Sequence, residues 1–461
     1  MTKTIQCISP VDGSLFAERP VAGGSDAQRA IDTARAAQRR WAALPLEERV
    51  ALVRAGVARL GEMSEEVVPE LAWMMGRPIR YGGEFRGVEE RASYMADIAA
   101  ESLAPLLVEE SDAFERRIVR EPRGVVFVIA PWNYPYMTAI NSVAPALIAG
   151  NSVILKHASQ TLLVGERMVA AFVEAGVPEE VFQNLFLDHK TTASLIAARS
   201  FSFINFTGSV AGGKMIEQAA AGTLTEIGLE LGGKDPGYVM EDVDLDAAVE
   251  TLIDGAMFNS GQCCCGIERI YVTHSLYDRF VERAVEIVSG YRLGNPLEES
   301  TTLGPMAHQR FAKEVRAQVS EAVASGAKPM VDVSMFSAND GGTYLAPQIL
   351  TDVDHTMRVM QDETFGPVVG IMKVASDAEA IRLMNDSEFG LTASLWTRDA
   401  ERAATLGAQL ETGTVFMNRA DYVDPGLCWT GCKNTGRGGS LSVVGYHNLT
   451  RPKSYHLKKT T

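Results

Sequence analysis

A run of six apolar residues, VVFVIA at 125–130, constrains what this chain can fold into more than any other segment does. β-Branched and aromatic residues favour strands, and a strand without polar alternation is buried on both faces, as the strands of parallel sheets are. Further strands are predicted at 152–155 and 201–206, followed by helices at 161–175 and 212–221. Strands that alternate with helices in this way predict a doubly wound α/β domain.

The segments around this domain predict further helices and a second α/β unit. Helices are expected at 26–41, 46–61, 246–258, 277–289, 311–325, 377–385 and 399–410, and strands at 269–272, 393–396 and 414–417. Ser376 is placed to cap the helix at 377–385. The tail at 452–458 alternates polar and apolar residues, as a half-buried strand does, and we expect it to form a separate small sheet with 114–121.

The composition argues against several classes of function. The 461 residues carry a formal net charge of −15 and no run of basic side chains, which argues against a nucleic-acid partner. The apolar runs are too short to span a bilayer, and the first residues, MTKTIQCISPVDG, lack the apolar core of a signal peptide. We therefore expect a cytoplasmic protein without a membrane partner.

Three of the six cysteines are consecutive, in NSGQCCCG at 259–266. Six cysteines are too few for a disulfide scaffold in a chain of this length. Structural zinc ligands come as spaced pairs, and no histidine lies within eight residues of this cluster, so we expect no metal site. Two interpretations stay open from the residues alone: buried structural thiols, or one reactive thiol, because adjacent side chains point in different directions.

Two other segments have the residue types of a reactive site. In LELGGK at 229–234, Glu230 has leucine on both sides; it is either a solvated residue at a strand end or a carboxylate whose pKa is raised by desolvation, which suits a general base. In PWNYP at 131–135, two prolines flank Asn133 at the carboxyl end of the strand VVFVIA, where ligands of open α/β sheets bind. Asn133 is either part of a rigid turn or an amide donor for an oxyanion.

The segment TGSVAGG at 207–213 follows the strand at 201–206 and opens a helix. Its glycines allow close approach of a ligand to the backbone, and a helix N-terminus attracts phosphate. The segment does not match G-x-G-x-x-G, so from the residues alone an ordinary strand-to-helix turn is the stronger interpretation.

Taken together, PWNYP, TGS, LELGGK, FNSGQCCC and ETFGPV occur in the order and spacing of the aldehyde dehydrogenase superfamily, which the chain resembles from its first helices to its tail. The resemblance implies a nucleophile at Cys264, a general base at Glu230 and an oxyanion-binding amide at Asn133. It implies oxidation of an aldehyde to a carboxylic acid with NAD or NADP, through a thioester that Glu230 helps to hydrolyse.

The resemblance also assigns binding residues. For the cofactor these include Lys156 at the adenosine ribose and Glu363 at the nicotinamide ribose, and the full set is Trp132, Lys156, Ser159, Gly208, Ser209, Gly213, Leu231, Gly232, Glu363 and Phe365. Gly233 is a further position of close backbone approach. The substrate pocket is expected to be lined by Tyr136, Asn141, Ile267, Asp421, Tyr422, Val423 and Trp429.

The fold implied by the resemblance has a cofactor-binding domain, a second α/β catalytic domain and a small β arm for oligomerisation. We expect the cofactor domain at 1–105 and 124–231, the catalytic domain at 232–430, and the oligomerisation segments at 106–123 and 431–461, in a homodimer or homotetramer. An acyl-transferring relative that makes acyl-CoA is one alternative, although such relatives usually lack the glutamate that Glu230 supplies. A non-catalytic protein on the same fold is another.

The chain departs from the common family pattern at four positions. Asn141 replaces a frequent aromatic residue and Ser142 a frequent lysine in the helix after PWNYP. His157 follows Lys156 where proline is common, and Ser159 stands where many members carry glutamate. The last difference removes a carboxylate that would repel a 2′-phosphate, so we expect NADP to be accepted alongside NAD.

Overall fold

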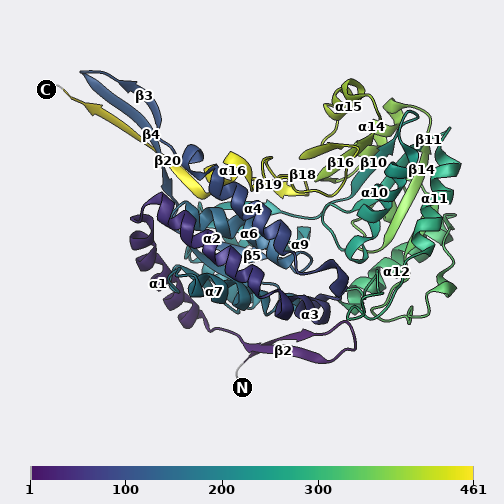
Figure 1. The fold of residues 1–461 in the computed structure, drawn as a ribbon, viewed down its shortest axis with the longest axis horizontal. Coiled ribbons are helices and arrows are strands. Elements are labelled where there is room, and N and C mark those ends of the chain that lie inside the picture. Colours follow the sequence, from purple (N-terminus) through teal and green to yellow (C-terminus); the bar gives the residue numbers. More distant parts are fainter. Residues whose placement is uncertain (1–2, 460–461) are drawn as a thin grey trace.

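The computed structural model describes residues 3–459, which form two large sheets, a small three-stranded sheet and their covering helices (Figure 1). The first large sheet has the strand order β19-β9-β8-β5-β6-β7. All of its strands are parallel except β19, which pairs antiparallel with β9. The strands are β5 (Val125–Ala130), β6 (Ser152–His157), β7 (Phe182–Asn184), β8 (Phe203–Thr207), β9 (Glu226–Glu230) and β19 (Gly436–Arg437).

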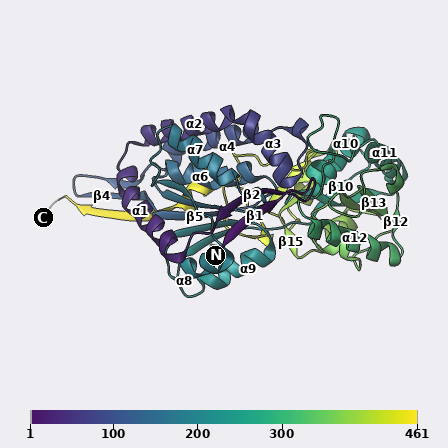
Figure 2. The ribbon, with the colours of Figure 1, turned by 90° about the horizontal axis from the view of Figure 1, so that it is seen from below.

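Both faces of this sheet are buried, as the apolar sequence of β5 predicts. Val126 and Val128 belong to one core cluster, and Val125 and Phe127 belong to another, because successive side chains of a strand point to opposite faces. The first cluster includes side chains of α2 (Leu46–Glu62), α3 (Ser64–Met75), α4 (Phe85–Asp97), α6 (Pro135–Ile148) and α7 (Val164–Glu174). The second includes α1 (Gly24–Ala42), α8 (His189–Ala197) and α9 (Val210–Ala220). Figure 2 shows α2, α4 and α7 on one side of the sheet and α8 and α9 on the other.

The second large sheet has the order β12-β13-β14-β11-β10-β16-β17. Its strands are parallel except for the short β12, which pairs antiparallel with β13. They are β10 (Asp235–Val239), β11 (Ile267–Thr273), β12 (Lys328–Pro329), β13 (Gln348–Thr351), β14 (Val368–Val374), β16 (Thr392–Trp396) and β17 (Thr414–Met417). The helices that accompany this sheet are α10 (Leu245–Met257), α11 (Tyr277–Ser289), α12 (Gln309–Ala324), α13 (Arg358–Gln361), α14 (Asp377–Asn385) and α15 (Ala400–Gly407).

A three-stranded antiparallel arm extends from the first sheet (Figure 1). In it β20 (Thr450–Lys458) pairs with β4 (Phe114–Pro122) along its whole length, and β4 pairs with β3 (Leu106–Glu110). The separate small sheet predicted from the tail is therefore present. The helix α16 (Ser442–Leu449), which packs against α6, leads into the arm. A hairpin of β1 (Thr4–Ile8) and β2 (Leu15–Pro20) lies near the start of the chain.

Most predicted elements are present with small shifts of their ends. The strand at 125–130 and the helices at 277–289 and 377–385 match residue for residue, and Ser376 accepts a hydrogen bond from Glu379 N as the expected cap. The helix predicted at 161–175 is shorter, because a 3-10 turn at Ser159–Thr161 precedes α7. In the segment 3–459, no helix is long and apolar enough to cross a membrane.

The last segment of the chain contributes to several parts of the fold. β18 (Cys432–Lys433) pairs with β15 (Phe389–Gly390), β19 completes the first sheet, and only β20 lies in the arm. The division of the chain into domains at the expected boundaries remains a prediction.

Candidate active site

The cysteine cluster lies in a tight loop between α10 and β11. Asn259, Ser260 and Gly261 all have positive φ, at 54°, 56° and 69°. The position of Gly261 admits only glycine, because a β-carbon there would meet the backbone oxygen of Gly366 at 2.1 Å. The backbone of ETFGPV therefore packs directly against the loop that carries the cysteines.

Hydrogen bonds hold this loop to the PWNYP segment and to a neighbouring loop. Asn259 Nδ2 donates to the backbone oxygen of Asn133 at 3.2 Å. Gln262 accepts from Ala307 N at 2.8 Å through its side-chain oxygen, and its side-chain nitrogen donates to Asn259 O at 3.0 Å. Side-chain amides thus replace the regular backbone pairing that the loop lacks.

The three thiols differ in exposure and in ionisation. Cys263 and Cys265 are buried, at 8% and 3% exposure, with their sulfurs 3.5 Å apart, whereas Cys264 is partly exposed. The neighbouring thiols of Cys264 and Cys265 favour the ionised form of Cys263, which lowers its pKa. The pKa of Cys264 is raised, by its hydrogen bond to Cys263 and also by burial. The lowered pKa therefore favours Cys263 as the nucleophile, whereas the partial exposure of its side chain favours Cys264. We give exposure more weight, because a nucleophile must reach its substrate.

Glu230 is the last residue of β9. Its carboxylate accepts a hydrogen bond from Thr207 Oγ1 at 3.2 Å. Burial raises the pKa of Glu230, while the nearby hydroxyls of Ser440 and Thr207 and the charge of Arg91 act in the opposite direction. The buried Ser440 hydroxyl makes no hydrogen bond of regular geometry with any residue in 3–459. A buried carboxylate with a raised pKa, three residues before the glycine that contacts the Cys264 backbone, is suited to general-base chemistry.

Asn133 lies at the turn from β5 to α6, with 4% of its surface exposed. Its backbone oxygen accepts hydrogen bonds from Arg77 and Asn259. Its side-chain amide makes no hydrogen bond to any residue in 3–459 and is therefore free to donate to a ligand. Arg77 is paired with Glu84 in a buried ion pair, and Glu84 also accepts from Tyr136 N and Met137 N, which caps α6. This pair holds the Asn133 turn in place.

The ETFGPV segment also contacts LELGGK. Glu363 Oε1 accepts from Gly233 N at 3.1 Å, and a β-carbon at Gly232 would meet the same carboxylate at 2.4 Å. Burial, together with the charge of Glu268, raises the pKa of Glu363 to about 8. Nearby, the Trp132 ring stacks on Phe311 with 5.2 Å between ring centroids and meets Phe365 edge-on at 5.5 Å.

The residues assigned to the other end of a dinucleotide lie on β6, the turn after it, and α9. Lys156 is largely buried, which lowers its pKa, and it makes no ion pair within the described part of the chain; Ser159 is exposed. Ser209 caps α9 by accepting from Gly212 N at 3.2 Å, next to Gly208. Gly213 packs against Leu231, since a β-carbon there would meet the Leu231 side chain at 2.7 Å. A capped helix N-terminus, close-approach glycines and an unpaired lysine fit a phosphate-containing cofactor.

The expected pocket residues do not all face the cysteines. Tyr136 is fully buried against Phe85 and lies near Glu70 and Arg167, and Ile267 is buried in the core of the second sheet. Tyr134, which the sequence analysis did not single out, lies near Cys263 and Asp421 instead. The structure therefore places Tyr134, and not Tyr136, beside the cluster.

The late loop at 418–429 packs over α4. Tyr422 donates its hydroxyl proton to Glu90 on that helix, and the Arg419 guanidinium lies 3.6 Å from the centroid of the Tyr422 ring. Val423 and Trp429 pack against the core that includes α4 and α6. Burial raises the pKa of Asp421 to about 7. Asn141 on α6 is buried and accepts from Arg91 at 3.2 Å.

Sequence reasoning missed the ion pair that joins these segments. Lys234 Nζ donates to Glu268 Oε2 at 2.7 Å and to Thr364 Oγ1 at 2.8 Å, and Glu268 accepts from the backbone nitrogens of Thr364 and Phe365. The lysine of LELGGK was the available signal, because a lysine after two glycines in a buried segment requires a partner.

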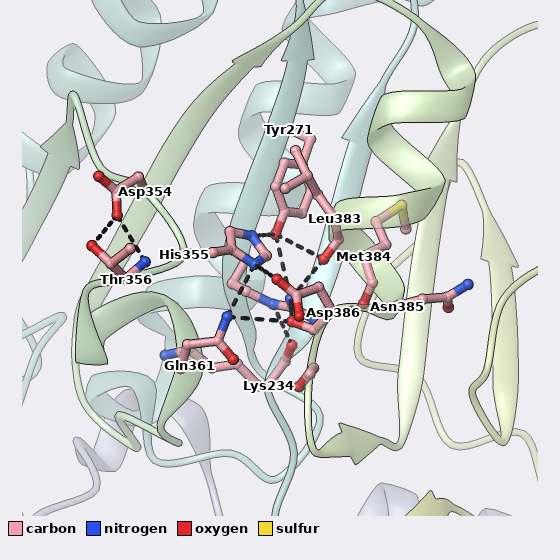
Figure 3. Close-up of polar contacts among 12 residues, drawn as sticks. Lys234, Tyr271, Asp354, His355, Thr356, Gln361, Leu383, Met384, Asn385 and Asp386 are labelled. Carbon is pink, nitrogen blue, oxygen red and sulfur yellow. Dashed lines mark hydrogen bonds and ion pairs between the residues drawn. The ribbon is translucent and has the colours of Figure 1, made fainter.

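A second polar network reaches the backbone of Lys234 (Figure 3). Arg269 Nε donates to Lys234 O at 2.8 Å, and the same guanidinium donates to backbone oxygens at the end of α14. Tyr271 bonds to His355 at 2.8 Å, and His355 bonds to Asp386 at 2.7 Å. These contacts fix β10, β11 and α14 relative to one another. Among residues 3–459, no group of three or more His, Cys, Asp or Glu side chains is arranged to hold a metal ion.

Comparisons with known proteins agree with this arrangement. The sequence profile described as "Aldehyde dehydrogenase family" matches residues 1–455. The chain is 32% identical to the succinate semialdehyde dehydrogenase [NAD(P)+] Sad of Escherichia coli, over 96% of this chain and 95% of that protein. It is 33% identical to the vanillin dehydrogenase of Corynebacterium glutamicum, over 94% and 89%. A solved NADP-dependent glyceraldehyde-3-phosphate dehydrogenase from Bacillus halodurans, complexed with NADP, superposes with a TM-score of 0.93 at 31% identity, covering 99% of this chain and 96% of that one.

Proposed function

This chain belongs to the aldehyde dehydrogenase family, whose members oxidise aldehydes with NAD or NADP, and from that premise we propose that its reaction proceeds through a thioester on Cys264. The observation that carries the proposal is the contact between the segments. Gly233, three residues after Glu230, lies against the backbone oxygen of Cys264, and the cysteine loop is bonded to the Asn133 turn through Asn259.

The first half of the reaction forms the thioester. The Cys264 thiolate attacks the aldehyde carbon, so a carbon–sulfur bond forms and the carbonyl electrons move to oxygen. The Asn133 side-chain amide and the Cys264 backbone N–H donate to this oxyanion, and one such donor is typically worth about 3–4 kcal/mol. The residues assigned to the cofactor would hold NAD or NADP, which would supply the acceptor for the hydride that leaves the same carbon.

The second half releases the acid. Glu230 takes a proton from a water molecule, the resulting hydroxide attacks the thioester, and the Cys264 thiolate leaves as the carboxylic acid forms. The raised pKa of Glu230 supports this role, because a base works best when its pKa is near the working pH.

The cofactor residues have separate tasks. We propose that Ser209 and the N-terminus of α9 bind the pyrophosphate, that Lys156 and Ser159 meet the adenosine ribose, and that Glu363 accepts from the nicotinamide ribose. The pKa of Glu363 is raised to about 8. A ribose hydroxyl that donates a hydrogen bond to this carboxylate would favour its ionised form, so binding of the cofactor would also release the proton of Glu363.

The named substrates of the relatives differ, from succinate semialdehyde to vanillin, so the family alone does not choose one. The test is a panel of aldehydes assayed with NAD and with NADP, in which reduced nicotinamide and carboxylic acid form in equal amounts. Mass spectrometry should find the acyl group on the peptide that carries Cys264. Product that forms only when coenzyme A is added would favour acyl transfer, and absence of product with every aldehyde would contradict the proposal.

A further inference from the structure

Arg91, on α4, is a buried cation that forms no ion pair with any residue in 3–459. Only 9% of its surface is exposed, and burial lowers its pKa, yet a guanidinium stays protonated in proteins. Its Nη1 donates to Met137 O at 3.1 Å and to Asn141 Oδ1 at 3.2 Å. Its Nε and Nη2 donate to no residue in 3–459, and no carboxylate there forms an ion pair with it. A buried charge normally has a partner, so the partner is expected to come from outside the chain.

The other deeply buried arginines of the described chain show what a satisfied arginine looks like. Arg77 is paired with Glu84, and Arg269 donates to backbone oxygens through all three of its nitrogens. Arg49 donates to three backbone oxygens. Compared with these, Arg91 uses only its Nη1 donors, and three of its five N–H donors make no hydrogen bond within 3–459.

Arg91 lies near the residues assigned to the reaction. The charges of Glu84, Cys265, Cys264 and Glu230 all act on its guanidinium. The helix α4 packs against α6, which carries Asn141, and the two helices lie side by side in Figure 1. The loop at 418–429 is joined to α4 by the Tyr422–Glu90 hydrogen bond. Arg91 therefore lies where the expected substrate pocket meets the cysteine cluster.

A role of Arg91 as counter-ion to carboxylates of this chain does not account for its position. Glu84 is already paired with Arg77. Glu230 accepts from Thr207, and the charge of Arg91 is the smallest of the influences on its pKa. Asn141, which accepts a hydrogen bond from Arg91, replaces an aromatic residue that is frequent in the family. The polar pair Arg91 and Asn141 therefore occupies space where the family commonly places an apolar ring.

We propose that Arg91, oriented by Asn141, binds a carboxylate carried by the substrate, so that this chain oxidises aldehydes with a carboxylate at the far end. The inference rests on the proposed function, because it takes the aldehyde end to be held at Cys264. The free Nε and Nη2 form the planar fork that binds a carboxylate with two hydrogen bonds. A phosphate dianion fits less well, because the nearby carboxylates Glu84 and Glu230 would repel its second charge.

The experiment compares pairs of aldehydes of equal length with and without the carboxylate: 4-oxobutanoate with butanal, and 5-oxopentanoate with pentanal. In the unmodified enzyme, kcat/KM for the carboxylate member should exceed that for the neutral member by roughly ten- to one-hundred-fold, the range expected for hydrogen bonds to a charged group. Arg91→Met should reduce this ratio to near one, chiefly through KM, and Arg91→Lys should restore part of it.

Arg86→Met is the matched control, because Arg86 lies on the same helix, is exposed and makes no hydrogen bond or ion pair within 3–459. It should leave the ratio unchanged. Binding of succinate and of butyrate, the products of the shorter pair, measured by calorimetry, gives a readout that does not depend on turnover: succinate should bind more tightly, and Arg91→Met should remove the difference.

The outcomes separate the two proposals. Equal kcat/KM for both members of each pair in the unmodified enzyme would overturn the role of Arg91 and leave the aldehyde oxidation intact. An unchanged ratio in a folded Arg91→Met protein would do the same. If neither member of any pair is oxidised with either cofactor, the proposed function fails, and the assignment of the carboxylate to Arg91 fails with it.

Discussion

The backbone oxygen of Cys264 lies directly over the α-carbon of Gly233: a β-carbon at position 233 would meet that oxygen at 2.4 Å. This contact joins the strand end that carries Glu230 to the loop that carries the thiols. It also explains why two consecutive glycines are needed, since a β-carbon at Gly232 would meet the Glu363 carboxylate at 2.4 Å.

Gly233→Ala should therefore lower kcat by about 100-fold, because a rigid backbone atom must move and a displacement of ~1 Å at a reacting group has that effect. Gly232→Ala is the comparison, because its β-carbon would meet the carboxylate of Glu363, a side chain that can rotate away. It should raise KM for the cofactor more than it lowers kcat. Steady-state kinetics of both variants measure the difference, and a larger kcat loss in Gly232→Ala would contradict this reading of the contact.

Cys264→Ser should remove most turnover, by ~1,000-fold or more, because an alcohol is poorly ionised near neutral pH. Cys263→Ser and Cys265→Ser should keep much of it, since both side chains are buried. The three variants are also a direct test between access and ionisation, because the pKa of Cys263 is the one that is lowered. Loss of turnover in a folded Cys263→Ser with activity retained in Cys264→Ser would move the nucleophile to Cys263.

Glu230→Gln keeps the shape of the side chain and removes its basicity, so acyl-enzyme should accumulate and be visible by mass spectrometry after mixing with aldehyde and cofactor. In the unmodified enzyme, deacylation should slow as the pH falls through the raised pKa of Glu230, because the carboxylate becomes protonated. The variant should lack this dependence. Unchanged turnover at neutral pH would exclude an essential base.

The stability of the same variant provides its control. A carboxyl whose pKa is raised by folding binds more protons in the folded state, so its contribution to stability decreases as the pH rises from the usual range of a glutamate through the raised value. Glu230→Gln removes that decrease. Its Tm at pH 8 should equal or exceed that of the unmodified enzyme, which separates lost chemistry from lost folding.

The strands and helices followed from the sequence where one physical signal dominated. The all-apolar β5 could only be a strand buried on both faces, and both core clusters contact it. Helices such as α3 and α4 were missed because their apolar faces are interrupted, by Pro69 in α3 and by the buried Arg91 in α4. A buried arginine has no periodic signature, since the sequence does not say which polar side chain turns inward.

The candidate site was predictable as a set of segments but not as a set of contacts. The order of PWNYP, LELGGK, NSGQCCCG and ETFGPV identifies the family. Tyr136 was expected in the pocket as part of the helix after PWNYP, but it lies near Glu70 and Arg167, whereas Tyr134 lies near Cys263. Lys234 with Glu268, and Arg77 with Glu84, pair residues 34 and 7 positions apart in the chain. Only the folded backbone shows that these pairs meet.

We propose that the arm mediates assembly into a homodimer or a dimer of dimers. Both β20 and β3 are edge strands, and Leu106, Leu107 and Val108 of β3 are 63%, 55% and 55% exposed, which is a hazard that pairing with a second copy removes. Light scattering at micromolar concentration should give a dimer or tetramer, and deletion of residues 452–461 should dissociate it. A monomer both before and after the deletion would contradict the proposal.

The last prediction concerns the choice between NAD and NADP, and it depends on Ser159. A glutamate at this position would accept hydrogen bonds from the adenosine hydroxyls and would repel a 2′-phosphate. Ser159 is exposed at the start of the 3-10 turn after β6, so the repulsion is absent and a hydroxyl is available to donate. Lys156, at the end of the same strand, makes no ion pair in the described chain and can add a charge-assisted contact.

NADP should therefore be accepted alongside NAD, and Ser159→Glu should shift the preference toward NAD chiefly by weakening NADP, by roughly tenfold or more if one charge-assisted contact is lost. The ratio of kcat/KM for the two cofactors measures this in both proteins. Ser159→Ala is the control, because it removes the hydroxyl without adding a charge and should reduce the NADP preference less than the glutamate does. An unmodified enzyme without NADP turnover would refute the idea, and so would a Ser159→Glu variant whose ratio stays the same, since the side chain at this position would then have no contact with the 2′-position.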